Sequence, residues 1–291
     1  MSEPRLSPAD YQQLMSKSRQ TVFWALDDAA GPWELEPGEP AAPGGDWFFM
    51  VSFPRTGSTV ASLILNLHPD IYCGQEQMVL PLFMTVLHSR LLLAPDMWYS
   101  VRYSKQIPVT AANVRALMDA WRGCVSAKRI FGDKGVMYHQ HFGAACSAVF
   151  PGCKLVLTVR HPLDTLSSYI QQPWAAFMRN DPQRTFVEHI RSRAYELLTG
   201  NTTWREQAEV IDFEQLGSEA GFRSTFSRIF AHLGADANGY EWDSAWALCR
   251  HRFTSGRWQY DTEILAFMDW LEHRDRKLHR LLADGASYLD G

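Results

Sequence analysis

The chain has 291 residues, of which 46% are hydrophobic, and it carries a formal net charge of −4. This length allows one large α/β domain or two small ones, and the hydrophobic content is ample for a packed core. The acidic balance argues against a nucleic acid partner, so any bound anion must be held by locally placed cations. No run approaches 18 apolar residues and the start of the chain lacks a signal-peptide pattern, so we expect a cytoplasmic protein that does not contact a membrane.

The five cysteines are odd in number and include no Cys-x-x-Cys pair. They are Cys73, Cys124, Cys146, Cys153 and Cys249. This pattern predicts neither a disulfide framework nor a zinc site, and we expect reduced thiols.

The first 45 residues are predicted to form a helix and a tether. Ser7 is a good N-cap with Pro8 at the first helical position, and the helix extends to about Ala29. Residues 31–45 contain four prolines and several glycines, which suit a tether. We therefore expect a single domain over residues 46–291, with the first helix packed against it or used in a homodimer.

The segment after the tether predicts a strand, a turn and a helix. Trp47–Phe53 is apolar and rich in aromatic residues, Val60–Leu67 is apolar at helical length, and Pro54–Thr59 lies between them. Unpaired N–H groups at the start of a helix favour an anion, Gly57 allows close approach, and Arg55 adds a positive charge. Because the turn has one glycine and no lysine, it does not match the Walker pattern of ATP and GTP sites.

Two amphipathic helices are predicted next, over Met78–Leu93 and Ala111–Val125. Between them, Pro95–Tyr99 breaks the pattern with aromatic side chains. These aromatic residues are candidates for lining an acceptor pocket, with simple partial burial as the alternative.

The second half of the chain alternates strands and helices. Lys154–Val159 is apolar enough for a central parallel strand, and a helix is expected over Leu163–Tyr169. Thr185 begins a capping box that predicts a helix ending at Gly200, and Ala208–Phe213 predicts a third strand. This alternation favours an α/β fold with a mostly parallel central sheet flanked by helices.

Three segments together resemble sulfotransferases that use 3′-phosphoadenosine 5′-phosphosulfate (PAPS), most closely the protein-tyrosine sulfotransferase and related bacterial branch. Arg55–Glu76 is similar to the family's 5′-phosphosulfate-binding segment, and Val159–Tyr169 to its 3′-phosphate-binding segment. Val210–Leu216 resembles a third family strand, with Phe213 where the family usually has tyrosine. The resemblance implies a P-loop-like three-layer fold and transfer of a sulfuryl group from PAPS, without a metal, to an acceptor hydroxyl or amine.

The resemblance also implies roles for individual residues. Arg160 and Ser168 match the 3′-phosphate ligands, and a guanidinium fork suits a phosphate dianion. Arg55 and Lys134 match groups that stabilise charge on the leaving phosphate. The alternative for Arg160 is a structural pair with Asp164.

The general base is left open between a carboxylate and a histidine. Glu76 matches the carboxylate of the tyrosine-sulfating branch and is preferred, while His139 and His141 lie near the histidine used by small-molecule cytosolic sulfotransferases. The alternative for Lys134 is a solvated side chain or an ion pair with Asp133.

The basic turn over Arg252–Tyr260 matches the family only loosely, and it adds two residues to the predicted nucleotide site. The full predicted set for the co-substrate is Arg55, Thr56, Gly57, Ser58, Thr59, Arg160, Ser168, Ser255 and Arg257.

Two other functions stay open from the sequence. One is a magnesium-dependent small-molecule kinase in which Asp212 and Glu214 form a Walker-B-like pair; the other is a non-catalytic nucleotide-binding protein. For the sulfotransferase, a small metabolite is the preferred acceptor, as in natural product biosynthesis. The preference rests on the 11 Trp, 10 Tyr and 16 Phe residues that are available to form an apolar pocket.

Overall fold

A parallel sheet of five strands forms the centre of the computed structural model, which describes residues 35–76, 79–80, 83–84, 108–135, 140–175 and 183–285. The spatial order is β2-β3-β1-β4-β5, and every neighbouring pair is parallel. The strands are β1 (Trp47–Ser52), β2 (Ile71–Gln75), β3 (Ile130–Gly135), β4 (Lys154–Val159) and β5 (Ala208–Asp212). Because all five point the same way, their carboxyl ends meet at one edge of the sheet, where ligands of such sheets usually bind.

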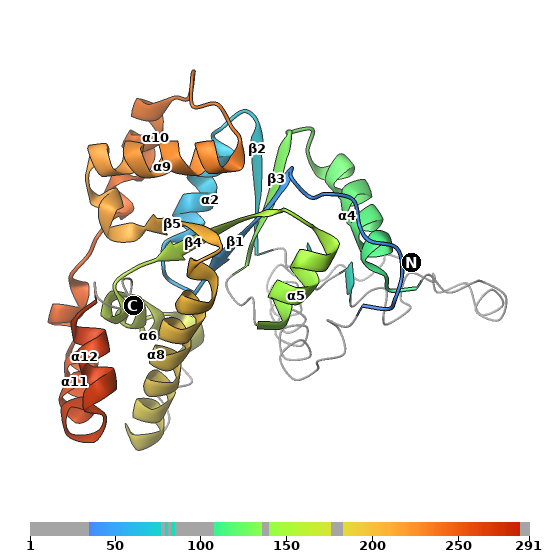
Figure 1. Ribbon diagram of the computed structural model, residues 1–291. Coiled ribbons are helices and arrows are strands. Elements are labelled where there is room, and N and C mark those ends of the chain that lie inside the picture. Colours follow the sequence, from blue (N-terminus) through green and yellow to red (C-terminus); the bar gives the residue numbers. More distant parts are fainter. Residues whose placement is uncertain are drawn as a thin grey trace, which may run out of the picture.

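One face of the sheet is covered by α4 (Ala111–Val125) and α5 (Gln140–Val149), as Figure 1 shows. The core on this side is aromatic: Phe49 of β1 lies 5.3 Å from the ring of Phe142 and 5.2 Å from the ring of Phe150. All three side chains are fully buried.

The opposite face is covered by α2 (Ser58–Asn66) and α9 (Glu219–Leu233), with α10 (Trp242–Cys249) packed outside them. Phe48 and Met50, which alternate with Phe49 along β1, face this side. A strand that is buried on both faces must be apolar throughout, and this explains the unbroken run in β1.

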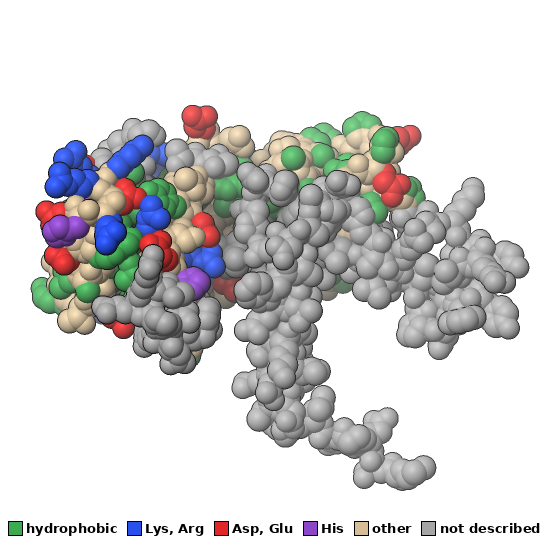
Figure 2. Space-filling model, turned by 90° about the horizontal axis from the view of Figure 1, so that it is seen from below, with side chains coloured by type: hydrophobic (Ala, Val, Ile, Leu, Met, Phe, Trp, Pro, Cys, Tyr) green, Lys and Arg blue, Asp and Glu red, His purple; other side chains and the backbone are tan. Residues whose placement is uncertain are grey.

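A third group of helices packs together next to β4 and β5, and one of its members, α8, also contacts both strands. It consists of α6 (Pro162–Ile170), α8 (Gln183–Arg205), α11 (Thr262–Arg274) and α12 (Arg276–Ala283), which share a separate apolar core. Four 3-10 helices complete the described elements: η2 (Pro173–Ala175), η3 (Phe213–Gly217), η4 (Arg250–Arg252) and η5 (Arg257–Tyr260). Seen from below, the end of the molecule that carries this group shows basic and acidic side chains interspersed (Figure 2).

The predicted fold class is confirmed: the layers are helix, parallel sheet and helix. The prediction found β1, β4 and β5 to within one residue and missed β2, β3, α5, α9 and α10. Strand β3 contains Gly132, Asp133 and Lys134, all buried, and such a polar sequence gives no strand signal.

The predicted ends of α8 were wrong. Both Thr185 and Gly200 lie inside the helix, which continues to Arg205. A glycine within a helix costs only about 1 kcal/mol relative to alanine, and the buried Leu197 and Trp204 on either side fix the helix against the core.

Other predictions lie wholly or partly outside the described residues. They are the helix over 7–29, most of the helix over 78–93, the aromatic segment 95–99 and His139. The described part of the tether, residues 35–45, contains neither helix nor strand, as predicted. Within the ranges given above, we find no helix that is both long and apolar enough to cross a membrane.

Candidate active site

The turn between β1 and α2 has a tightly curled backbone. Gly57, the N-cap of α2, has a φ of 90°, and a Cβ atom there would lie 2.3 Å from the ring of Phe213. Arg55 also has a positive φ, 75°, which is uncommon for a residue with a side chain. Because the N-cap is a glycine, it offers no side-chain capping hydrogen bond at the start of α2, and the first N–H groups of the helix can bind an anion.

Thr56 holds this turn in place. Its hydroxyl donates to the carbonyl oxygen of Phe53 at 2.8 Å and shares a 2.7 Å hydrogen bond with the hydroxyl of Thr158 in β4. The side chain of Thr56 is buried, whereas Arg55 and Thr59 are exposed.

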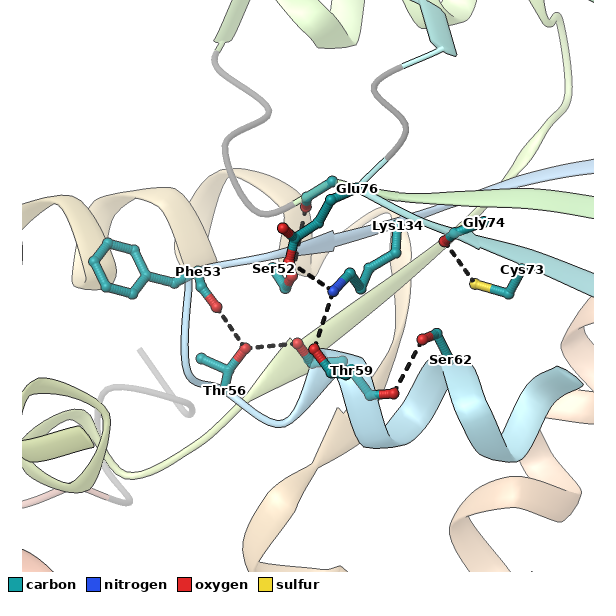
Figure 3. A network of polar contacts seen from close by, with 11 residues as sticks. Ser52, Phe53, Thr56, Thr59, Ser62, Cys73, Gly74, Glu76 and Lys134 are labelled. Carbon is teal, nitrogen blue, oxygen red and sulfur yellow. Dashed lines mark hydrogen bonds and ion pairs between the residues drawn. The ribbon is translucent and has the colours of Figure 1, made fainter. Parts of the chain in front are cut away.

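Lys134 connects the turn to the neighbouring strands (Figure 3). Its ammonium lies 2.8 Å from Oε1 of Glu76 and 3.1 Å from the hydroxyl of Thr59. The lysine side chain is 1% exposed and the glutamate side chain 47% exposed, so a buried cation is paired with a carboxylate that reaches solvent. The strand order β2-β3-β1 creates this arrangement, because Glu76 follows β2 and Lys134 lies on β3.

The alternative partner proposed for Lys134 was wrong. Asp133 and Lys134 are consecutive on β3, so their side chains point to opposite faces of the sheet. The Asp133 carboxylate accepts a hydrogen bond from the backbone N–H of Val79 instead, at 3.1 Å.

Arg160 follows β4 and packs against the same turn. It donates to the carbonyl oxygens of Arg55 at 3.3 Å and Thr254 at 2.8 Å, and its guanidinium lies 4.6 Å from the centre of the Phe213 ring. Arg55 in turn donates to the Ser168 hydroxyl at 3.1 Å. The structure therefore brings together Arg55, Arg160 and Ser168, which the sequence predicted as one site.

Several positive charges meet here. Burial lowers the pKa of Arg160; the carboxylates of Asp164 and Glu214 raise it, and the charges of Arg257 and Arg55 lower it again. Burial also lowers the pKa of Arg55. Because neighbouring guanidinium groups disfavour the charge of Arg160, an added polyanion would be stabilising here.

A buried carboxylate fastens the loop that covers Arg160. Asp164, 1% exposed, accepts hydrogen bonds from the backbone N–H groups of Gly256 at 2.6 Å and Trp258 at 3.1 Å. This contact holds the loop so that the Thr254 carbonyl reaches Arg160 and Arg257 stays near it. The sequence did not reveal the role of Asp164, because its partners lie more than 90 residues further along the chain.

Ser255 and Arg257 both lie in this loop and are exposed. The charge of Arg257 lowers the pKa of Arg160, and the assignment of Ser255 and Arg257 to the nucleotide site stays a prediction. The side chain of His141, at the start of α5, lies outside the described structure, as does His139. The choice between Glu76 and a histidine as base therefore stays a prediction.

The acidic pair Asp212 and Glu214 serves as backbone caps. Asp212 accepts the N–H of Glu214 at 3.0 Å, and Glu214 accepts the N–H of His161 at 3.1 Å. Desolvation raises the pKa of Glu214 to about 7. Both carboxylates thus accept backbone hydrogen bonds, and among the described residues no group of three or more His, Cys, Asp or Glu side chains could hold a metal ion. The Walker-B-like pair stays an alternative.

Comparison with known proteins shows the family of the chain. The model of the sulfotransferase family matches residues 48–239, about two thirds of the chain. A curated Caenorhabditis briggsae protein named "Putative protein-tyrosine sulfotransferase" is 49% identical over 37 residues. That match covers 13% of this chain and only 13% of the curated relative.

Two solved sulfotransferase domains are similar in structure. The domain from the curacin biosynthetic pathway is 16% identical with a TM-score of 0.51, and the match covers 85% of this chain and 99% of that domain. The domain from the Synechococcus PCC 7002 olefin synthase is 19% identical with a TM-score of 0.48, and the match covers 89% of this chain and 97% of that domain. At such low identity the curacin-pathway domain supports the fold alone.

Proposed function

The chain belongs to the sulfotransferase family, and on this premise we propose that it transfers a sulfuryl group from PAPS to a hydroxyl or amine of a small-molecule acceptor. The observation that carries the proposal is the ion pair of buried Lys134 with half-exposed Glu76, beside Thr59 at the turn. It sets a cation and a carboxylate next to a helix N-terminus that is suited to an anion.

The residues of the site fit the charges of the donor. Arg160, Ser168 and Arg257 would hold the 3′-phosphate: Arg55 connects Ser168 with Arg160 through hydrogen bonds, and the charge of Arg257 acts on Arg160. Arg55, Ser58, Thr59 and the first N–H groups of α2 would hold the 5′-phosphosulfate. The close contact of Phe213 with Gly57 leaves no room for a side chain on that wall, so backbone amides can approach the donor directly.

Different residues would act on the leaving phosphate and on the acceptor. Transfer breaks the bond from sulfur to the bridging oxygen, so negative charge grows on the leaving phosphate. Lys134 and Arg55 would stabilise this charge, since preorganised cations in a partly desolvated site act most strongly where charge develops. Glu76 would accept the proton of the acceptor, and its ion pair with Lys134 keeps the carboxylate in place.

A thermal-shift experiment tests the donor site. The product nucleotide 3′-phosphoadenosine 5′-phosphate (PAP), at 100 times its Kd, should stabilise the protein by about 2.7 kcal/mol and raise Tm by about 4 °C. Adenosine 5′-phosphate, which lacks the 3′-phosphate, should give a much smaller rise at the same concentration.

Arg160→Met should lower PAP affinity about tenfold or more, because it removes charge-assisted hydrogen bonds worth roughly 1.5–3 kcal/mol each.

The response to each ligand distinguishes a sulfotransferase from a kinase and from a non-catalytic nucleotide-binding protein. In Arg160→Met, the rise in Tm with PAP should fall towards the rise seen with adenosine 5′-phosphate. The rise with adenosine 5′-phosphate should be the same as in the wild type. Equal shifts for the two nucleotides would contradict a 3′-phosphate site, and a rise only with ATP and magnesium would favour the kinase. PAP release from PAPS, measured over a panel of hydroxylated and amino metabolites, then tests turnover and the acceptor class; binding without release would leave a non-catalytic protein.

Asp164 should act as a positioning residue for the donor. Asp164→Asn keeps the size of the side chain but removes the carboxylate that accepts from Gly256 and Trp258. We expect the Kd for PAP to rise about fivefold to tenfold through loosening of the loop, as isothermal titration measures. The KM for PAPS should rise by a similar factor with little change in kcat.

Asp275→Asn is the matched control for this prediction. Asp275 also caps backbone, through the N–H of Leu278 in α12, and its side-chain partners Arg191 and Tyr195 lie on α8 and not in the loop. Both variants should lose stability, and only Asp164→Asn should lose PAP affinity. Similar PAP affinities in the two variants would show that Asp164 does not position the loop.

A further inference from the structure

Two of the five cysteines lie side by side although the sequence places no Cys-x-x-Cys pair. Cys146 lies on the last turns of α5 and Cys153 immediately before β4, and their sulfur atoms are 3.4 Å apart. Gly152, with a φ of 74°, reverses the chain between them. A disulfide requires the sulfur atoms to approach by only about another 1.4 Å.

The pair borders a recess of about 140 Å³ on the surface. Cys146 is buried, whereas Cys153 is partly exposed, so a reagent entering the recess meets Cys153 first. The walls around the pair are formed by Gly143, Ser147, Phe150 and Gly152. Glycines and a serine leave room for a small sulfur compound beside the thiols.

The two thiols differ in reactivity. The hydrogen bond from Cys146 lowers the pKa of Cys153, and the charge of Arg115 lowers it further, although burial opposes both. Burial raises the pKa of Cys146. Cys153 is therefore the better nucleophile, and Cys146 is placed to resolve what forms on it.

We propose that Cys146 and Cys153 form a redox-active dithiol that a low-molecular-weight disulfide converts to an intramolecular disulfide. The Cys153 thiolate attacks one sulfur of the small disulfide, forming a mixed disulfide and releasing one small thiol. Cys146 then loses its proton to solvent and attacks the sulfur of Cys153, releasing the second small thiol. In sum, two protein thiols are oxidised and one small disulfide is reduced to two thiols.

This dithiol is separate from the proposed donor site. Cys153 precedes the first residue of β4, whereas Arg160 follows its last residue. The two places are thus at opposite ends of the strand, about 20 Å apart along it. Oxidation should leave PAP affinity unchanged, so the dithiol can be tested whatever the outcome for the donor site.

The test treats the full chain with oxidised glutathione, blocks free thiols, and measures intact mass and disulfide-linked peptides. The expected product has lost two hydrogens, about 2 Da, carries two fewer blocking groups than the reduced chain, and yields a pair of peptides joined by a disulfide between Cys146 and Cys153. Cys146→Ser should stop at a glutathione adduct on Cys153. The control Cys124→Ser removes an exposed cysteine outside the pair and should react as the wild type does.

The peptide map of the wild-type chain decides the proposal without any variant. A stable glutathione adduct on Cys153 with no link to Cys146 would overturn it, as would faster modification of Cys124 than of Cys153. Tm should be higher after oxidation than before it if the new disulfide forms without distortion. Dithiothreitol should return Tm to its starting value.

Discussion

Replacing Glu76 by glutamine should lower kcat by a factor of about 10²–10⁴, the usual contribution of a positioned general base. The amide oxygen of glutamine can still accept the hydrogen bond from Lys134, which is 2.8 Å long in the wild type, so the geometry of the pair should persist. The amide cannot take a proton from the acceptor. Turnover is measured as PAP release at saturating PAPS and acceptor, and the Kd for PAP should stay within about twofold because the donor contacts remain.

Glu188→Gln is a matched control for this variant. Glu188 is also about half exposed and lies near a cation, Arg191, at 3.5 Å, but on helix α8. Its kcat should equal that of the wild type. Full kcat in Glu76→Gln would remove Glu76 as the base and direct the same test to His139 and His141.

The sequence predicted the local parts of this site. Strand β1, the turn and the start of α2 are consecutive, and apolar patterning with a glycine is enough to predict them. Arg160 lies just before α6 and Ser168 lies within it, and the resemblance of Val159–Tyr169 to the family's 3′-phosphate-binding segment is what assigned them. Parts of a site that one strand–turn–helix unit supplies can be predicted from the sequence alone.

The rest depends on contacts between distant segments. Lys134 is buried because β3 lies between β2 and β1, and its partner Glu76 is 58 residues away. Composition gives no signal for a strand with a buried lysine, since burial of such a charge is stabilising only once its partner is in place. The role of Phe213 also depends on distant segments, because its ring packs against the guanidinium of Arg160 and against Gly57. Both contacts use the aromatic ring and neither uses a hydroxyl.

Lys134→Met gives the second large effect, an expected loss in kcat of about 10²–10³, comparable to removal of one preorganised donor. Methionine has a similar length and is apolar, so it can occupy the buried path of the lysine stem. Glu76 is 47% exposed and stays solvated without its partner, so the fold should survive. Tm, kcat and the Kd for PAP are measured together to separate catalysis from stability.

Lys128→Met provides the control for loss of a lysine. Lys128 donates to the carbonyl oxygens of Asn66, His68 and Ile71 at 2.9–3.0 Å, at the end of α2 remote from the turn. Its loss should lower Tm and leave kcat nearly unchanged, because these hydrogen bonds support structure alone. A drop in kcat as large as that of Lys134→Met would indicate that any loosening of α2 impairs turnover.

The double variant Glu76→Gln with Lys134→Met separates two roles of the lysine. If Lys134 only orients Glu76, its loss has no further effect once the carboxylate is gone, and the double variant equals Glu76→Gln. If Lys134 also stabilises the leaving phosphate, its loss lowers kcat again. We expect a further fall of about tenfold or more, since the ammonium also contacts Thr59 at the turn, on the donor side. Equal kcat values for the double variant and Glu76→Gln would assign Lys134 to positioning the base alone.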